Sequence, residues 1–162
     1  YTTLFRSEIK TFYKEEYLVG EYAVALIERR IGIKLPVDEA GFIALHIVNA
    51  EYNTVMRDTI DITNLIQNVV KIVKEYFSMD LDETSLNYQR FVTHLRFLAQ
   101  RIIGGEMLNS DNPEFNQLIS QMYPEEYACS LKLKDYIQVT YHHDVTEEET
   151  AYLAVHIKRI RI

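Results

Sequence analysis

The sequence predicts an all-α protein built from two related helical units. Apolar residues recur at three- and four-residue spacing through most of the 162 residues, and only five glycines and three prolines interrupt them. That spacing lines one face of a helix, whereas a half-buried strand alternates residue by residue, and no segment alternates convincingly. A domain-length internal repeat indicates that the helical pattern occurs twice. Together these observations favour a helical fold throughout.

The repeat consists of residues 5–47 and 115–157, which align without a gap. Each copy ends in Glu-x-x-aromatic-aliphatic-Ala-aliphatic-His-Ile, at residues 39–47 and 149–157. A repeat of this length indicates two similar folded units rather than a solenoid, whose repeats are about 20–50 residues long. Residues 54–112 have no upstream counterpart, so we expect the first unit to be incomplete in this chain. The chain would then hold a five-helix bundle preceded by the last three helices of a similar unit.

In the first unit the repeat predicts helices at residues 4–13, 15–31 and 37–51. Pro36 and Asp38 mark the start of the third helix, since proline and aspartate are common at helix N-termini. Residues 53–61 are polar and lack a long apolar stripe, which favours a linker. The expected division into first unit, linker and second unit is therefore residues 1–52, 53–61 and 62–162.

In the second unit five helices are predicted, at residues 62–78, 83–103, 114–122, 125–142 and 147–160. The first carries many β-branched residues, but its apolar spacing and its length outweigh that strand propensity. Asp80 and Glu83 are expected to cap the second helix, and Pro124 falls in the first turn of the fourth. Thr146 and Glu149 are read as a capping box that opens the last helix.

Composition limits the function classes. The formal charge is −7 and the isoelectric point about 5.2, so this segment should be repelled by phosphate backbones and bind nucleic acid poorly by itself. No apolar run approaches the ~20 residues of a membrane helix, so no membrane insertion is expected. The single cysteine, Cys129, lies in a helical pattern and is expected to be a small buried residue. Low cysteine use fits a reducing cytoplasm.

The chemistry is expected at histidines. Of the five, His46, His94 and His156 lie inside strongly amphipathic segments, and His46 and His156 are repeat equivalents. Arg90 and Arg101 fall on the same flank of a predicted helix as His94. Two guanidinium groups beside an imidazole suit a phosphoryl group, because arginine binds phosphate oxygens in a bidentate manner. A neutral, reachable imidazole nitrogen can also accept that group as a nucleophile.

Other readings of the histidines stay open. A histidine at the margin of an apolar stripe is more often a partly buried packing residue, and shared ancestry alone could keep two of them in register. Metal binding is disfavoured, because neither His-x-x-x-His nor Glu-x-x-His spacing occurs. His142 and His143 read as a solvated helix end. The sequence contains no Gly-rich phosphate loop, Gly-x-Ser-x-Gly or Cys-x-x-Cys, so no cofactor and no enzymatic activity are expected.

Three segments carry a family resemblance. Residues 35–51, Leu-Pro-Val-Asp-Glu-Ala-Gly-Phe-Ile-Ala-Leu-His-Ile-Val-Asn-Ala-Glu, resemble the end of a PTS regulation domain (PRD). Residues 91–101 and 152–157 look like the two histidine segments of a second such domain. The match is closest to bacterial transcriptional antiterminators of the BglG/SacY type, and it covers essentially the whole chain.

The resemblance implies a regulatory module rather than an enzyme. In this family two tandem PRDs follow a small RNA-binding domain, and the phosphotransferase system phosphorylates histidines in both. Transfer from the phosphocarrier HPr to the second domain usually favours an active homodimer. Transfer dependent on a sugar-specific enzyme II usually acts on the first domain and inactivates. The active, cytoplasmic protein binds a nascent RNA hairpin through its upstream domain and prevents a terminator from forming.

Residue by residue, His46 matches the second histidine of the first domain, and His94 and His156 match the two histidines of the second. These three are the expected phosphorylation sites, with Arg90 and Arg101 as phosphate-contact candidates. The family often has Asp before the first histidine of its first domain, whereas Thr93 precedes His94 here. The same module in a DNA-binding transcriptional activator, or a histidine phosphotransfer enzyme, remains an alternative.

Overall fold

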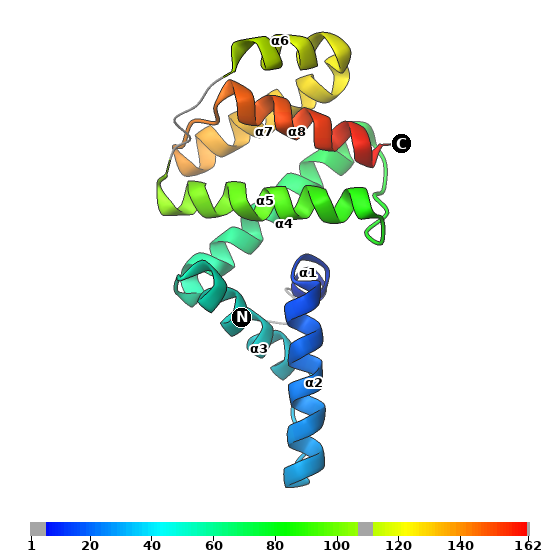
Figure 1. Cartoon of the computed structure of the whole chain (residues 1–162), viewed down its shortest axis with the longest axis vertical. Helices are drawn as coiled ribbons and strands as arrows, with labels where there is room; N and C mark the ends of the chain where they lie inside the picture. The colour runs from blue at the N-terminus through cyan, green and yellow to red at the C-terminus, as the bar shows by residue number, and fades with distance from the viewer. Residues whose placement is uncertain (1–5, 107–111, 162) are drawn as a thin grey trace. The chain divides into compact units, whose positions relative to one another are not determined.

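The computed structural model describes residues 6–106 and 112–161, which form eight α-helices (Figure 1). The helices are α1 (Arg6–Phe12), α2 (Lys14–Ile31), α3 (Glu39–Tyr52), α4 (Met56–Phe77), α5 (Leu86–Gly104), α6 (Pro113–Met122), α7 (Pro124–Tyr141) and α8 (Glu147–Ile160). No strand occurs in this described part of the chain, so the predicted all-α fold is confirmed. The part of the predicted helix 4–13 before residue 6 lies outside the described residues.

The chain folds as two compact units, residues 1–64 and 65–162. In the second unit α8 packs against α5, α6 and α7 (Figure 1). Its inward face is fully buried and consists of Ala151, Leu153, Ala154 and Ile157. Full burial of a large aliphatic side chain contributes about 1.5–3 kcal/mol. The packing of α8 against three helices therefore fixes where its remaining side chains lie.

In the first unit α2 packs against α3, and α1 contacts both. The crossing of α2 and α3 is very close at Gly20: a Cβ atom added there would lie 2.2 Å from the backbone oxygen of Ala40. Backbone at that distance cannot give way as a flexible side chain would. Glycine at this position is therefore required by the approach of the two helices, not by an unusual backbone angle.

Gly20→Ala is expected to destabilise the first unit by about 1–3 kcal/mol, because the added methyl group forces α2 and α3 apart. The measurement is thermal unfolding followed by circular dichroism. Gly104→Ala is the matched control, since a Cβ there meets no atom within 4 Å. Equal melting temperatures for both variants would contradict the close crossing.

The helix predicted at 62–78 begins earlier, at Met56, so residues 56–61 of the expected linker are helical. Two polar residues in these turns face inward, because Thr59 and Thr63 are buried. The Thr63 hydroxyl donates to the Thr59 carbonyl oxygen at 2.8 Å and shares a hydrogen bond with the Tyr13 hydroxyl, while Thr59 donates to Asn49. Because these hydroxyls are satisfied by hydrogen bonds, they continue the buried stripe of α4, and Thr59 does so within the expected linker.

The predicted cap of the next helix is wrong. α5 begins at Leu86, and its N-cap is Ser85, whose hydroxyl accepts a hydrogen bond from the Tyr88 amide at 3.1 Å. The Asp82 carboxylate instead accepts bonds from the amide and hydroxyl of Thr84. This local turn competes with helix formation, so residues 83–85 stay outside the helix.

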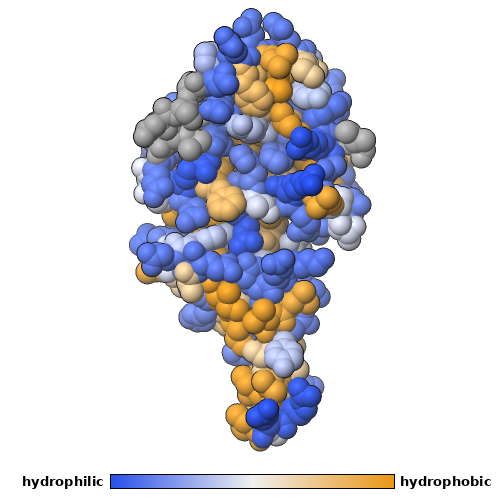
Figure 2. Space-filling view, viewed as in Figure 1, coloured by the Kyte–Doolittle hydropathy of each residue, from blue (hydrophilic) through white to orange (hydrophobic). Residues whose placement is uncertain are grey.

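Equivalent positions of the two units differ in exposure. Val19 of α2 is 53% exposed, whereas its repeat partner Cys129 of α7 is fully buried, as the sequence predicted for the cysteine. Burial raises the pKa of the Cys129 thiol to about 12. In the second unit α4 contacts α7 through a hydrogen bond that Asn68 donates to the Tyr136 hydroxyl at 3.0 Å. In the first unit the α2 residues Leu18 and Tyr22 are exposed like Val19. Figure 2 shows hydrophobic side chains on the surface of the molecule.

Candidate functional site

The candidate site lies where α5 packs on α8 in the second unit. His94 and Arg101 are seven residues apart on α5, and Glu149 and His156 are seven residues apart on α8. Seven residues are close to two full turns, so each pair lies on one flank of its helix. Packing of the two helices brings these flanks together.

The two histidine rings of the second unit are neighbours. The centroids of His94 and His156 are 4.8 Å apart, with an angle of 31° between the ring planes. Tyr152 and Phe91 flank them, with centroids 6.2 Å from His94 and His156 respectively. The structure therefore brings two of the three predicted site histidines together although 62 positions separate them in the sequence.

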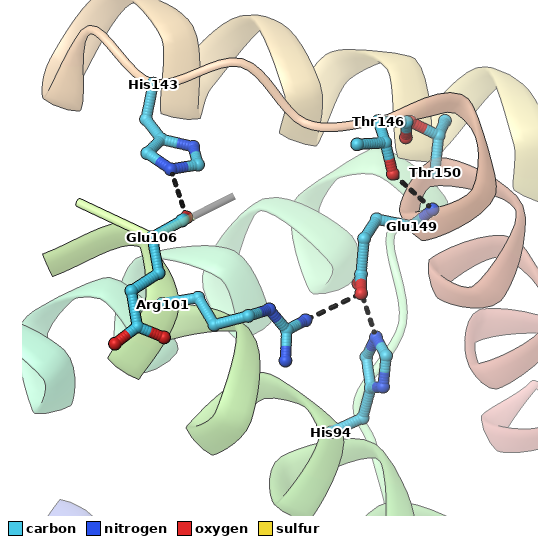
Figure 3. A network of polar contacts seen from close by, with 7 residues as sticks. All are labelled: His94, Arg101, Glu106, His143, Thr146, Glu149 and Thr150. Atoms are coloured by element: carbon cyan, nitrogen blue, oxygen red, sulfur yellow. Dashed lines mark hydrogen bonds and ion pairs between the residues drawn. The ribbon is translucent and has the colours of Figure 1, made fainter. Parts of the chain in front are cut away.

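Glu149 connects the site to α5 (Figure 3). Its carboxylate is 7% exposed; one oxygen lies 2.6 Å from a guanidinium nitrogen of Arg101 and the other lies 3.2 Å from Nε2 of His94. The Arg101 contact is a hydrogen-bonded ion pair. The His94 contact has the distance of an ion pair without the angle of a well-aligned hydrogen bond. A nearly buried carboxylate thus contacts two of the three predicted groups of α5, His94 and Arg101.

The electrostatics of the site follow from burial and these contacts. Burial alone would raise the pKa of Glu149, but the contacts with His94 and Arg101 outweigh it and the pKa is lowered. Burial, together with the positive charges of His94, Arg159 and Arg90, lowers the pKa of His156 to about 4. At neutral pH Glu149 is therefore ionised and His156 is neutral, which is the state that a nucleophilic imidazole requires.

Beside the rings is an open groove of about 460 Å³, lined by Leu86, Gln89, Arg90, Thr93, His94, Phe97 and His156. Leu86 and Phe97 at its margin are 64% and 56% exposed. The groove thus combines two imidazoles and a guanidinium group with an apolar rim. Such a surface can receive a phosphoryl group carried by another protein.

The other predicted residues lie elsewhere. His46 lies on α3 in the first unit and is exposed; it is the only histidine in residues 1–64. His142 is the exposed C-cap of α7, in the left-handed conformation. His143 is half-buried, and its Nε2 lies 2.9 Å from the Glu106 carbonyl oxygen (Figure 3). The reading of these two as a helix end is confirmed, but only His142 is solvated.

Glu149 is the residue whose role the sequence reading missed. The prediction that Thr146 caps α8 is confirmed, since its hydroxyl accepts from the Glu149 amide at 3.2 Å. The Glu149 side chain, however, points to α5 instead of closing a capping box. A signal was present: the pair Glu149 and His156 has the same spacing as its repeat equivalent, Glu39 and His46.

Among residues 6–106 and 112–161, no group of three or more His, Cys, Asp or Glu side chains is placed to hold a metal ion. Within the same described residues, no helix is both long and apolar enough to cross a membrane.

Comparison with known proteins identifies the family of this chain. The sequence matches the PRD domain family over residues 3–50 and 67–160, so the chain belongs to that family and the resemblance seen in the sequence is confirmed. It is 42% identical over 153 residues to the transcription antiterminator LicT of Bacillus subtilis, covering 94% of this chain and 55% of that protein. It is 40% identical over 154 residues to a beta-glucoside operon antiterminator of Dickeya chrysanthemi, covering 95% and 54%. Protein GlcT of Staphylococcus saprophyticus is 33% identical over 150 residues, with coverage of 93% and 53%.

Proposed function

We propose that this chain is the regulatory part of a bacterial transcription antiterminator, in which phosphorylation of His46, His94 and His156 by the phosphotransferase system shifts a homodimer between inactive and active forms. The names of two relatives support antitermination. The chain spans about half the length of these relatives. RNA binding is therefore assigned to an upstream domain, in keeping with the charge of −7 on this segment.

The observation that carries the proposal is the pair of rings at the groove. Phosphoryl transfer to a histidine needs a neutral ring nitrogen that a donor can reach. His156 is neutral at cytoplasmic pH because its pKa is about 4, and both rings line an open groove. If the two histidines served only to pack α5 against α8, no groove beside them would be required. The apolar rim of the groove suits contact with a protein donor. HPr and a sugar-specific enzyme II are the proposed donors.

The phosphate contacts are proposed to differ between the two arginines. Arg90 lines the groove, so it can meet a phosphoryl group on either ring directly. Arg101 is bound to Glu149 and would become a contact only after leaving that carboxylate. If Arg101 left Glu149, the nearly buried carboxylate of Glu149 would lose its ion-pair partner. This is one way for phosphorylation to change the packing of α5 on α8.

Two further assignments belong to the proposal. The first unit is assigned to one PRD and the second unit to another, and the boundary between the units falls inside α4, between residues 64 and 65. The names of the relatives favour an antiterminator over a DNA-binding activator or a phosphotransfer enzyme. A phosphotransfer enzyme would additionally pass its phosphoryl group to a third protein.

Incubation with enzyme I, HPr and phosphoenolpyruvate is expected to phosphorylate His94 and His156, because their rings line the groove. Phosphopeptide mapping identifies the modified residues, and sedimentation of the same samples measures whether the homodimer forms. His94→Ala and His156→Ala should each remove one site of labelling.

His142→Ala is the control for simple accessibility, since this exposed histidine lies outside the groove. Labelling should be unchanged in that variant. Label found only at His142 or His143 would show that the groove is not the acceptor site.

A further inference from the structure

Each ring at the groove has one nitrogen that solvent cannot reach. Nε2 of His94 and Nδ1 of His156 have essentially no accessible surface. The side chain of His94 nevertheless retains 20% of its exposure, and both rings line the groove. The part of the His94 ring that faces the groove therefore does not include Nε2. In the same way, the part of the His156 ring that faces the groove does not include Nδ1. The two histidines thus present opposite nitrogens to an incoming group.

Glu149 adds a chemical reason at His94. Its ionised carboxylate lies 3.2 Å from Nε2 of His94. A carboxylate oxygen and an imidazole lone pair repel each other, so Nε2 carries the proton and the lone pair of the neutral ring lies on Nδ1. The carboxylate is itself held by Arg101 at 2.6 Å, so it cannot turn away freely. Glu149 is in this way a positioning residue for the His94 ring.

We infer that the two histidines accept phosphoryl groups on different ring nitrogens, His94 on Nδ1 and His156 on Nε2, and that Glu149 sets the choice at His94. The inference rests on the proposed function and adds the acceptor atoms to it. An N-phosphorylated donor supplies the group. The imidazole lone pair forms the new N–P bond, and the donor's P–N bond breaks with its electron pair returning to the donor nitrogen.

The proton stays on the covered nitrogen of each ring during this step. Phosphorylated His94 is then a ring cation with its protonated Nε2 beside the Glu149 carboxylate, whose negative charge stabilises it. His156 has no carboxylate at its covered nitrogen among the contacts of the described residues. Removal of the Glu149 carboxylate should therefore change the isomer at His94 and leave that at His156 unchanged.

The test uses protein labelled with ¹⁵N-histidine and two-bond ¹H–¹⁵N correlation spectra, which distinguish the two tautomers and the two phosphohistidine isomers. Before any phosphorylation, His94 is expected as the Nε2–H tautomer. After treatment with potassium phosphoramidate, His94 should carry phosphorus on Nδ1 and His156 on Nε2. His94→Gln and His156→Gln assign the signals. The urea-unfolded chain treated in the same way should give one common isomer mixture at both residues.

Glu149→Ala should lower the Nδ1 to Nε2 isomer ratio at His94 at least about tenfold, which corresponds to about 1.4 kcal/mol of lost interaction with the carboxylate. Glu149→Gln keeps the shape of the side chain but has a single acceptor oxygen, which the Arg101 guanidinium takes, so its NH2 group faces Nε2 of His94. This variant should lower the ratio as well, which separates loss of the acceptor from loss of packing. Glu147→Ala changes an exposed glutamate of the same helix turn and should have no effect. All spectra are taken where circular dichroism shows the helices intact.

Phosphoramidate phosphorylates histidine without a protein donor. Failure of the proposed function can therefore be distinguished from failure of the inference about the acceptor nitrogens. If HPr labels neither ring while phosphoramidate gives the two expected isomers, the inference stands and the proposed function fails. If HPr labels both rings on the same nitrogen, the proposed function stands and the inference is overturned. Absence of phosphoramidate labelling in the folded chain, with labelling of the unfolded one, would also overturn it, because neither nitrogen would then be reachable.

Discussion

Replacing Glu149 with alanine is expected to lower the free energy of unfolding of the second unit by about 2–4 kcal/mol, because it removes one partner of a buried ion pair. The carboxylate is 7% exposed, and its loss leaves Arg101 without its contact in the packed region between α5 and α8. Arg101 keeps 23% of its exposure, so water reduces the cost below that of a fully buried charge. Urea unfolding followed by circular dichroism measures the change.

Glu147→Ala is the matched control for this prediction. Both glutamates lie in the first turn of α8 and interact with the helix dipole, but Glu147 is exposed. The control should change the free energy of unfolding by less than about 0.5 kcal/mol. Hydrogen exchange should place the loss of protection in Glu149→Ala on α5 and α8. Equal stability of the two variants would show that the ion pair contributes only what an exposed pair does.

Lowering the pH from 7 to 5 is expected to destabilise the second unit through His156. The pKa of this ring is about 4 in the folded chain against an ordinary value of 6.5, so between these values the unfolded state binds the proton and the folded state does not. The stabilisation is complete above about pH 6.5 and is lost as the pH falls toward 4. One pKa unit corresponds to about 1.4 kcal/mol, so the full loss is up to about 3 kcal/mol.

This effect has the same sign as that of Glu149 but occurs in a different pH range. The lowered pKa of Glu149 also stabilises the folded state, but this contribution is present above about 4.5 and is lost only as the pH falls through the folded value. The range from pH 7 to pH 5 therefore reports mainly on His156. The groups that face this ring are His94 and Arg90 of α5 and Arg159 and Glu149 of α8.

His156→Gln should be less sensitive to pH in this range, because it has no ring to protonate in the unfolded state. His142→Gln is the control, since that histidine is exposed. The measurement is the difference between unfolding free energies at pH 7 and pH 5 for wild type and both variants. The same difference in all three proteins would show that burial of His156 does not shift its titration.

These two effects bear on the proposed regulation. Each phosphoryl group adds about 1.5–2 negative charges at neutral pH. At the groove these charges would lie near Arg90, and they would compete with Glu149 for Arg101. The proposed shift between dimer forms would then be an exchange of partners by Arg101 at the packing of α5 on α8, where loss of the ion pair is expected to cost about 2–4 kcal/mol. Full reversal of a two-state equilibrium requires about 5 kcal/mol, which is more than this single exchange supplies.

The all-α fold, the repeat and the extents of most helices could be predicted from local sequence patterns alone. Helix α8 was predicted at its observed bounds, because Thr146 is a local cap and its apolar spacing is regular. Predictions from polarity and capping patterns were less successful, because the same polar residue can form a loop, cap a helix or lie buried with its hydrogen bonds satisfied. Thr59 was placed in a linker but is buried in α4 with a satisfied hydroxyl, and Asp82 forms a turn where a cap was expected nearby.

Assembly of the candidate site depends on how the helices pack, which no local pattern describes. The sequence identified His94 and His156 separately, but periodicity describes one helix at a time and cannot say that their rings lie 4.8 Å apart. The sequence also did not show whether Glu149 caps its own helix or contacts another, because its side chain is long enough for either. The packing of α8 against α5 places the Arg101 guanidinium 2.6 Å from that carboxylate, and this charge-assisted contact is stronger than a local cap. The acceptor nitrogens likewise depend on which side of each ring the neighbouring helix covers.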